Sequence, residues 1–272
     1  MFGAIIGDIC GSRFEWANIK SKQFQLFGRQ CRPTDDSIMT LAVAGAILAA
    51  DGDLNALSGC AVHAMQELGR KYPNAGYGGS FFNWIFAESP QPYNSWGNGA
   101  GMRVSPCAWA AKSLEEALAM SDAVTRVTHN HPEGMKGARA ITAAIYLARN
   151  GKTADEIRAH ISGNYYDIGF TLDEIRASYK FDVSCKGSVP QAIEAFLESV
   201  SYEDAVRGAV SIGGDSDTIA AMTGGIAEAY WGIPADLRER ALAFMDENMI
   251  GIVDAFESRY GRKTLPAQDV EP

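Results

Sequence analysis

The sequence predicts an all-α fold in a single domain, and three observations support this prediction. Serine or threonine stands three residues before an acidic residue at four places, apolar residues recur at helical spacing, and no segment alternates as a strand ladder would. With 272 residues, 47% of them hydrophobic, the chain can bury one sizeable core. We therefore expect one domain over residues 1–262 and a polar tail over residues 263–272.

Capping signals predict the starts of several helices. They pair Ser113 with Glu116, Thr153 with Glu156, Thr171 with Glu174, and Ser201 with Asp204. Ser188, followed by Val189 and Pro190, indicates a further start. Apolar residues at three- and four-residue spacing then predict helix in segments 141–147 and 192–200.

Two segments rich in small residues, 41–50 and 219–230, have the composition of central helices. Glycine inside a helix costs on the order of 1 kcal/mol relative to alanine. The presence of Gly45, Gly224 and Gly225 therefore indicates that another backbone passes close by. Gly232 and Pro234 predict the end of the second helix. Loops are expected at 72–79, 88–101 and 163–169.

Charge and cysteine content restrict the partners and the compartment. A net charge of -9 disfavours nucleic acid and anionic membrane surfaces, because the long-range field repels polyphosphate. The five cysteines are odd in number and contain no C-x-x-C pair, so we expect neither a disulfide framework nor a zinc site. The N-terminus has no basic region, and Asp8 interrupts its apolar run. We expect a soluble cytoplasmic protein without a membrane span.

Two short acidic motifs open the two small-residue helices. One supplies Thr34, Asp35 and Asp36, and the other supplies Asp215, Asp217 and Thr218. Each motif alone is typical of a helix cap, because Asp, Ser and Thr accept hydrogen bonds from free amides at helix N-termini.

The two motifs together favour a metal site. A cap needs one side-chain acceptor, whereas each motif offers three oxygen-bearing residues. If the two helices pack side by side, four carboxylates converge, and they require compensating cations. All six side chains provide oxygen, which suits two Mg²⁺ or Mn²⁺ ions better than Zn²⁺. Gly213 and Gly214 would allow the tight turn before the second helix.

At this point the chain resembles the ADP-ribosylglycohydrolase family over nearly its whole length. The five motifs that carry the resemblance are GDICGSRFE from Gly7, TDDS from Thr34, GNGAGMR from Gly97, TH from Thr128, and GGDSDT from Gly213. The resemblance implies an all-α orthogonal helical bundle with two Mg²⁺ or Mn²⁺ ions. It also implies a reaction at the anomeric carbon of the distal ribose of ADP-ribose.

The resemblance also implies residue roles. Thr34, Asp35, Asp36 and a bridging Asp217 would hold one ion, and Asp215, Asp217 and Thr218 would hold the other. Glu15 matches a mobile-loop glutamate close to the metals and would manage proton transfer. Without the resemblance, Glu15 would be interpreted as a solvated surface carboxylate. Glu15, Asp36 and Asp217 are thus the expected catalytic residues.

The ligand-binding residues are expected in two further motifs. Gly97, Asn98, Gly99, Ala100, Gly101 and Met102 have a glycine density that lets backbone amides surround a pyrophosphate, although a flexible turn has the same composition. By resemblance this segment binds ADP-ribose, and His129 lines the same cleft. A cluster of aromatic residues could stack on adenine, or could pack in the core, as helical spacing favours for Phe81, Trp84 and Phe86. Its other members are Tyr77, Phe82, Tyr93 and Trp96.

The function implied is a metal-dependent hydrolase that cleaves the glycosidic bond between ADP-ribose and a protein side chain. Two alternatives stay open, namely a hydrolase of free derivatives such as O-acetyl-ADP-ribose and a catalytically idle ADP-ribose-binding protein. The partner would be an ADP-ribosylated protein or a small ADP-ribose derivative, and the protein would be a monomer. The acceptor linkage is left undecided, because Arg13 and Trp16 flank the expected catalytic loop where family members differ.

Overall fold

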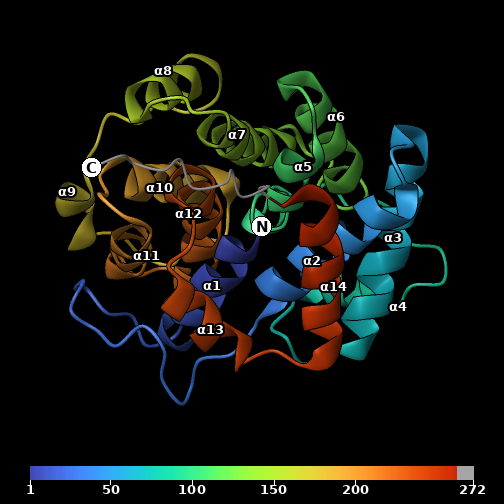
Figure 1. Ribbon diagram of the computed structural model, residues 1–272, viewed down its shortest axis with the longest axis horizontal. Coiled ribbons are helices and arrows are strands. Elements are labelled where there is room, and N and C mark those ends of the chain that lie inside the picture. The colour runs from blue at the N-terminus through green and yellow to red at the C-terminus, as the bar shows by residue number, and fades with distance from the viewer. Residues whose placement is uncertain (262–272) are drawn as a thin grey trace, which may run out of the picture.

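The computed structural model describes residues 1–261, which fold into helices joined by loops (Figure 1). The α-helices are α1 (Phe2–Gly11), α2 (Asp35–Ala50), α3 (Leu54–Lys71), α4 (Gly79–Phe86), α5 (Ser105–Ala110), α6 (Leu114–Thr125), α7 (Pro132–Arg149), α8 (Ala154–Asn164), α9 (Leu172–Arg176), α10 (Cys185–Leu197), α11 (Tyr202–Ser211), α12 (Ser216–Trp231), α13 (Ala235–Leu242) and α14 (Glu247–Tyr260). Two 3-10 helices are η1 (Ser12–Phe14) and η2 (Asn98–Ala100). No sheet forms within the described range, so the all-α prediction is confirmed.

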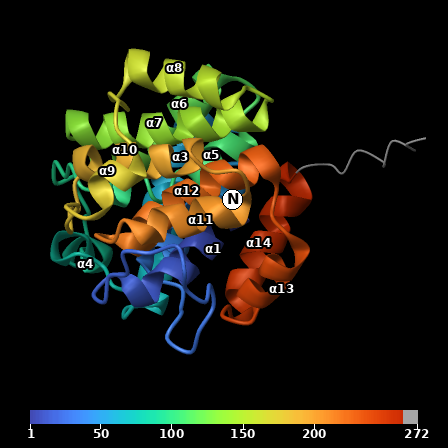
Figure 2. The same cartoon turned by 90° about the vertical axis from the view of Figure 1, so that its left-hand side faces the viewer.

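Helices α1 and α12 lie at the centre, with α8 and α13 at opposite ends of the molecule (Figures 1 and 2). Every residue of α1 is buried, and so is residue range 216–229 of α12. Their backbones approach closely, since a Cβ built on Gly7 would lie 2.0 Å from the Ala220 carbonyl oxygen. A Cβ on Gly224 would lie 2.3 Å from the carbonyl oxygen of Gly3. Glycine therefore permits the central helix pair to form.

This packing confirms most, but not all, of what the small-residue segments predict. Helices α2 and α12 are both largely buried, as central helices should be. They do not pack side by side along their length, however, because α1 takes the place against α12. They meet at their first turns, where Thr218 Oγ1 donates a hydrogen bond of 3.1 Å to Asp36. The prediction that another backbone passes close to Gly45 is also wrong, because no described atom outside its own helix lies within 4 Å of a Cβ built there.

The capping predictions are confirmed at all four places. Ser113 and Ser201 accept hydrogen bonds from the amides of Glu116 and Asp204. Thr153 and Thr171 form complete capping boxes with Glu156 and Glu174. These contacts are local, which is why sequence spacing alone could predict them. The regions predicted as loops are also largely outside α-helices.

The predicted start at Ser188 is wrong, because α10 begins at Cys185 with Ser184 as its N-cap. Ser188 lies inside the helix, and its hydroxyl donates to the Ser184 carbonyl at 2.7 Å. Ser184 caps the true start locally by accepting from the Gly187 amide at 3.0 Å, and the Cys185 amide also donates to the distant Trp96 carbonyl at 3.0 Å. The helix also ends at Leu197, earlier than the apolar spacing suggested.

Two further expectations concern the C-terminal tail and the absence of a membrane-spanning helix. The predicted polar tail at 263–272 lies outside the described residues. Within residues 1–261, none of the helices combines the length and the apolar character needed to cross a bilayer.

Candidate functional site

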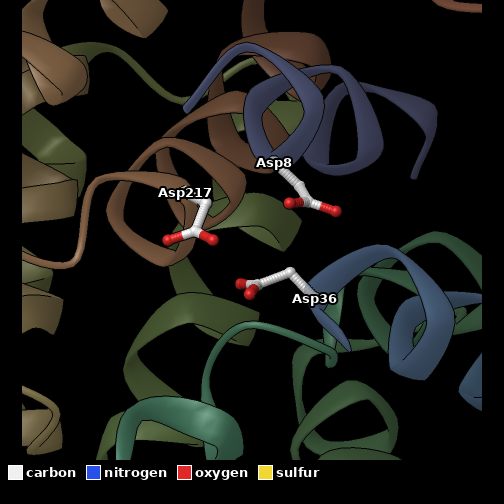
Figure 3. Close-up of side chains that lie close together, drawn as sticks. All are labelled: Asp8, Asp36 and Asp217. Atoms are coloured by element: carbon white, nitrogen blue, oxygen red, sulfur yellow. The ribbon is translucent and has the colours of Figure 1, made fainter. Parts of the chain in front are cut away.

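Three carboxylates from three helices converge on one point. Asp8 of α1, Asp36 of α2 and Asp217 of α12 point toward one another (Figure 3), and each offers an oxygen within 4.8 Å of the others. A second group of three joins Glu15, Asp215 and Asp217 within the same limit. Because Asp217 belongs to both groups, the two lie side by side and share one residue.

Asp8 positions the first acidic motif. Its carboxylate accepts hydrogen bonds from the amides of Thr34 and Ser37, at 2.8 and 3.0 Å, and from both of their hydroxyls. Since two of these donors are amides at the start of α2, Asp8 caps α2 from another helix. Thr34 directs its hydroxyl proton to Asp8 at 2.6 Å, which leaves lone pairs on the Thr34 oxygen for another partner.

The helix-cap interpretation of the two motifs does not account for their side chains. Thr34 and Asp215 are the N-cap residues of α2 and α12, and neither makes a side-chain capping bond. Within residues 1–261, Asp36 Oδ1 is buried without a hydrogen-bond partner. Because a buried carboxylate oxygen without a partner is costly, the site has spare capacity for a cation.

A glycine turn holds the second motif and connects it to the Glu15 segment. Gly213 and Gly214 have φ angles of +68° and +73°, which glycine adopts at low cost. The side chain of Asn18 then bonds to both backbone groups of Gly214, with the amide donating to it at 2.8 Å and the carbonyl accepting at 3.0 Å. The Asn18 side chain also donates to the Glu15 carbonyl at 3.0 Å. Asn18 therefore ties the Glu15 loop to the turn before α12.

The electrostatics of the cluster favour a bound cation. Burial raises the pKa of Asp36 and of Asp217 well above the usual range, and neighbouring carboxylates raise it further. Burial, with Asp215 next in effect, raises the pKa of Glu15 to about 7. None of these three carboxylates forms an ion pair with a lysine or arginine in residues 1–261. Either protons or divalent cations must therefore compensate the charge.

The donor set fits hard divalent cations. The groups that converge are carboxylates, with the Thr34 and Thr218 hydroxyls beside Asp36 at 3.4 and 3.1 Å. No histidine or cysteine belongs to either acidic group found among the described residues. Oxygen donors of this kind suit Mg²⁺ and Mn²⁺. Asp35 is the exception among the expected ligands, because it lines the cleft but belongs to neither group of three.

Most members of the acidic groups line a cleft of about 830 Å³, whereas Asp8 is fully buried behind it. The cleft lining includes Glu15, Asp36, Asp215 and Asp217 from the acidic groups, together with Asp35 and Thr218. Gly97, Asn98, Gly99, Met102 and His129 line the same cleft, so it brings together members of both expected sets, while the buried Thr34 is not among its lining residues. Asn98 joins them directly, since its side-chain amide donates to Asp215 at 2.6 Å.

Fewer backbone amides of the glycine-rich segment are free to bind a ligand than its composition predicts. The amides of Asn98, Ala100, Gly101 and Met102 already donate to backbone carbonyls, so they are not free to surround a pyrophosphate. Ala100 is fully buried, and a Cβ on Gly101 would lie 2.9 Å from the Met222 sulfur. Neither residue lines the cleft. The candidate ligand contacts in this segment are thus the Asn98 and Met102 side chains and the Gly99 backbone; Gly97 also lines the cleft, but its amide donates to the Ser95 hydroxyl at 3.2 Å.

The aromatic cluster divides between the core and the cleft. Trp84 is buried, and Phe81 is buried while also lining the cleft with Tyr77, Tyr93 and Trp96. Phe86 is 47% exposed, so its expected core position is wrong. The exposed Trp16 stacks on Phe181 at the cleft, with ring centroids 5.0 Å apart.

Sequence reasoning missed Asp8 and Asn18. Asp8 was treated only as an interruption of an apolar run, yet it is fully buried and burial raises its pKa to about 6. A charged residue inside an otherwise apolar helix is the signal that could have identified it. Asn18 carried no comparable signal, because its partner Gly214 is 196 residues away.

The fold and the site define an all-α protein whose cleft ends in paired acidic groups suited to divalent cations. Comparison with known proteins gives the family. The family model described as ADP-ribosylglycohydrolase matches residues 1–264, and the chain belongs to this family. Membership supports hydrolysis of an ADP-ribose compound as the class of reaction.

Relatives and a solved structure agree with this assignment. ADP-ribosylhydrolase ARH3 of Homo sapiens is 25% identical over 74% of this chain and 71% of its own length. ADP-ribosylarginine hydrolase Tri1 of Pseudomonas putida is 27% identical over 50% of this chain and 39% of its own length. A structure titled ADP-ribosylglycohydrolase-related protein complex has a TM-score of 0.68 at 21% identity and covers 95% of each chain. This last likeness supports the fold.

Proposed function

We propose that the protein is a hydrolase that uses two Mg²⁺ or Mn²⁺ ions to release ADP-ribose from a protein side chain. The observation that carries the proposal is the sharing of Asp217 by two acidic groups at the end of one cleft. In this proposal Thr34, Asp35, Asp36 and Asp217 hold one ion, while Asp215, Asp217 and Thr218 hold the other. The chemistry expected from bound ions of this kind is activation of a water molecule and orientation of the ribose hydroxyls.

The residues of the chain have separate tasks in the proposed reaction. Glu15 holds or releases the proton during cleavage of the bond at the anomeric carbon, a role that suits a carboxyl whose pKa lies near 7. Asn18 holds the Glu15 segment against the turn before α12. The buried Asp8 accepts four hydrogen bonds from Thr34 and Ser37 and so holds the backbone on both sides of Asp36.

The remainder of the cleft would hold the nucleotide part of the substrate. His129, Asn98 and the backbone of Gly99 are the proposed ligand contacts, and Trp96 or Tyr93 offers an aromatic face for adenine. We also propose that the protein acts as a monomer in the cytoplasm. All five cysteines have free thiols, as a reducing compartment requires.

The test is release of ADP-ribose from defined substrates. The purified protein would be incubated with arginine-linked and serine-linked ADP-ribosyl peptides and with O-acetyl-ADP-ribose, each with Mg²⁺, with Mn²⁺ and with EDTA. We expect release from at least one peptide that EDTA abolishes. Release from O-acetyl-ADP-ribose alone would show that the substrate is a small ADP-ribose derivative and not a modified protein. Binding of ADP-ribose without any release would favour a catalytically idle binding protein.

A further inference from the structure

Arg103 is a buried cation without an anionic partner. Its side chain is among the largest that are fully buried, with 1% of the residue exposed. Among residues 1–261, no carboxylate forms an ion pair with it, and its Nε is buried without a hydrogen-bond partner. Because an uncompensated buried charge is expensive, its presence beside a ligand cleft calls for an explanation. Arg103 is one of the residues that line this cleft.

One nitrogen of Arg103 leads to His129 through a hydroxyl group. Nη2 donates to Thr128 Oγ1 at 2.6 Å, and Thr128 Oγ1 lies 2.7 Å from His129 Nδ1. A guanidinium group can only donate hydrogen bonds, so the Thr128 oxygen accepts from Arg103. Its own proton remains available for His129 Nδ1, and we assign Nδ1 as the acceptor because this polarity also suits the neighbouring Nη2, which can only donate. Nη2 itself lies 3.5 Å from the same Nδ1 and reinforces this polarity.

This arrangement determines which ring nitrogen of His129 carries the proton and is presented to the cleft. A neutral imidazole carries one proton, so acceptance at Nδ1 places the proton on Nε2. Nε2 faces the glycine-rich segment, because a Cβ built on Gly99 would lie 3.1 Å from it and one on Gly97 would lie 3.6 Å away. Burial, followed by the charge of Arg103, also lowers the pKa of His129 well below its usual value. The ring is therefore neutral at physiological pH.

We propose that Arg103 and Thr128 are positioning residues that fix the Nε2–H tautomer of His129, so that this group donates to the pyrophosphate of the bound nucleotide. The nucleotide is the ligand of the proposed function, and the proposal rests on that function. The Arg103–Thr128–His129 chain places the positive charge of Arg103 behind the imidazole whose Nε2 faces the glycine-rich segment. An anionic ligand that enters a cleft with several carboxylates needs such a compensating charge.

A purely structural role for Arg103 is the alternative. Nη2 also lies 3.4 Å from the Val124 carbonyl at the end of α6, and the guanidinium carbon lies 5.7 Å from the centre of the Phe81 ring. These contacts would stabilise the fold without affecting the ligand. The two roles differ in what happens when only the Thr128 hydroxyl is removed, since Arg103 then keeps its packing.

The test compares Thr128→Val, which removes the hydroxyl, with Thr128→Ser, which keeps it. Thr125→Val is the matched control, because Thr125 is buried in the neighbouring helix end and its hydroxyl has no partner. Arg103→Met removes the charge. Affinity for ADP-ribose is measured by calorimetry with Mg²⁺ present, and affinity for Mn²⁺ alone shows that the acidic groups remain intact.

We expect Thr128→Val and Arg103→Met to weaken ADP-ribose binding by about tenfold or more, as loss of a charge-assisted hydrogen bond does. Thr128→Ser and Thr125→Val should bind as the unaltered protein does, and Mn²⁺ affinity should be unchanged throughout. Equal ADP-ribose affinity in Thr128→Val and Thr128→Ser would overturn the proposal. So would weakening by Thr125→Val as large as that by Thr128→Val.

Imidazole ¹⁵N chemical shifts provide a readout that does not depend on the ligand. The chain has four histidines, and the signals of His129 can be assigned from their loss in His129→Gln. We expect the unaltered protein to carry the proton on Nε2, and Thr128→Val to lose this single preference. A proton on Nδ1, or on both nitrogens near neutral pH, would overturn the positioning role even if ADP-ribose binds. Failure of the unaltered protein to bind ADP-ribose would instead overturn the proposed function and the ligand named here.

Discussion

The hydroxyl of Thr218 donates a hydrogen bond of 3.1 Å to Asp36, across 182 residues of sequence. This bond joins the first turns of α12 and α2 at the point where the acidic groups meet. Both helix N-termini direct their positive ends toward the carboxylates, which reduces part of the cost of gathering them. The Thr218 hydroxyl is a neutral donor and cannot compensate the charge of the carboxylates, whereas a bound cation would compensate it fully.

Asp217→Asn should remove metal binding and activity together. Asp217 belongs to both acidic groups, so its loss affects every ion that the cluster holds. Loss of even an outer hydrogen-bond partner costs roughly 10–100-fold in metal affinity, and we expect at least that much here. Calorimetric titration with Mn²⁺ and the rate of ADP-ribose release measure the two effects.

When metal is absent, Asp217→Asn should not destabilise the protein, although it removes metal binding and activity. In EDTA the raised pKa of Asp217 favours its protonated form, and Asn replaces this buried carboxyl with a neutral amide of similar size, so the melting temperature should be unchanged or higher. Asp254→Asn, which alters an exposed carboxylate on α14, is the control and should change neither quantity. Normal Mn²⁺ affinity in Asp217→Asn would show that this residue does not link the two groups.

Glu15→Gln should separate catalysis from metal binding. Proton transfer by a placed carboxyl contributes about 10²–10⁴-fold in rate, so kcat should fall by that order. Mn²⁺ affinity should change much less, because Asp36, Asp215 and Asp217 remain. The exposed Glu67, substituted by Gln, provides the control. If Glu15→Gln abolished Mn²⁺ binding but restored activity at high Mn²⁺, Glu15 would be a ligand and not a proton carrier.

Local signals in the sequence could predict the helices, but not the contacts between them. The capping boxes at Thr153 and Thr171 are complete within four residues, and both predictions are confirmed. The start at Ser188 was wrong because Ser184, four residues earlier, is the N-cap of α10, and a backbone bond from Cys185 to Trp96 accompanies this cap. Local spacing contains no information about a partner 89 residues away.

The candidate site shows the same division. The two acidic motifs attract attention because each has more oxygen-bearing residues than a cap requires, and the structure brings Asp36 and Asp217 together. The role of Asp8 could not be predicted from its neighbours in the sequence, because its hydrogen-bond donors Thr34 and Ser37 lie 26 and 29 residues away. Arg103 stands at the end of the glycine-rich motif, and its burial cannot be deduced from the sequence because a lone arginine is usually exposed.

Asp8→Ala should destabilise the protein without direct involvement of a metal. The substitution leaves the amides of Thr34 and Ser37 without an acceptor, and each unsatisfied buried donor costs about 1–3 kcal/mol. We expect a total loss of roughly 3 kcal/mol, or about 6–12 °C in melting temperature for a chain of this size. The measurement is made in EDTA so that loss of metal does not contribute.

Asp53→Ala provides a comparison for Asp8→Ala. Asp53 is an exposed N-cap that accepts one hydrogen bond from the Asn55 amide at 2.9 Å. Its removal should cost only about 1 kcal/mol, as for other caps. Equal losses for the two substitutions would mean that Asp8 contributes no more than an ordinary cap.

The stabilisation by Mg²⁺ should increase with pH. The pKa of Asp35 is raised to about 8 and that of Asp8 to about 6, both from an ordinary 3.8, chiefly because the carboxyls are buried. The folded state thus binds these protons more tightly than the unfolded chain. Their contribution to stability is present below about pH 4 and is lost as the pH rises toward about 8. Mg²⁺ needs the ionised form, so it should restore stability most at high pH.

Differential scanning calorimetry in EDTA and in Mg²⁺ tests this dependence. We expect the melting temperature in EDTA to fall between about pH 5.5 and about pH 8, and the difference made by Mg²⁺ to be larger at the higher value. NaCl at matched ionic strength controls for screening of surface charges. An equal effect of Mg²⁺ at both pH values would show that no proton is exchanged for the ion.

Two glycine substitutions in central helices should act in opposite directions. Gly45→Ala places its methyl group in open space on α2, so it should stabilise by about 0.5–1 kcal/mol through helix propensity. Gly224→Ala places its methyl group 2.3 Å from the Gly3 carbonyl oxygen, and a backbone atom cannot move aside as a side chain can. We expect a loss of roughly 2 kcal/mol or more, because α1 must shift away from α12.

That shift makes Gly224→Ala informative about the site as well as the fold. α1 carries Asp8, so displacement of α1 should weaken Mn²⁺ binding although Gly224 lies far along α12 from the acidic groups. Melting temperatures and Mn²⁺ titrations of both variants measure the two effects. If Gly224→Ala melted as Gly45→Ala does, the close packing of α1 on α12 would not be needed for stability. If it lost stability but bound Mn²⁺ normally, the position of Asp8 would be fixed by its own hydrogen bonds to α2 and not by α12.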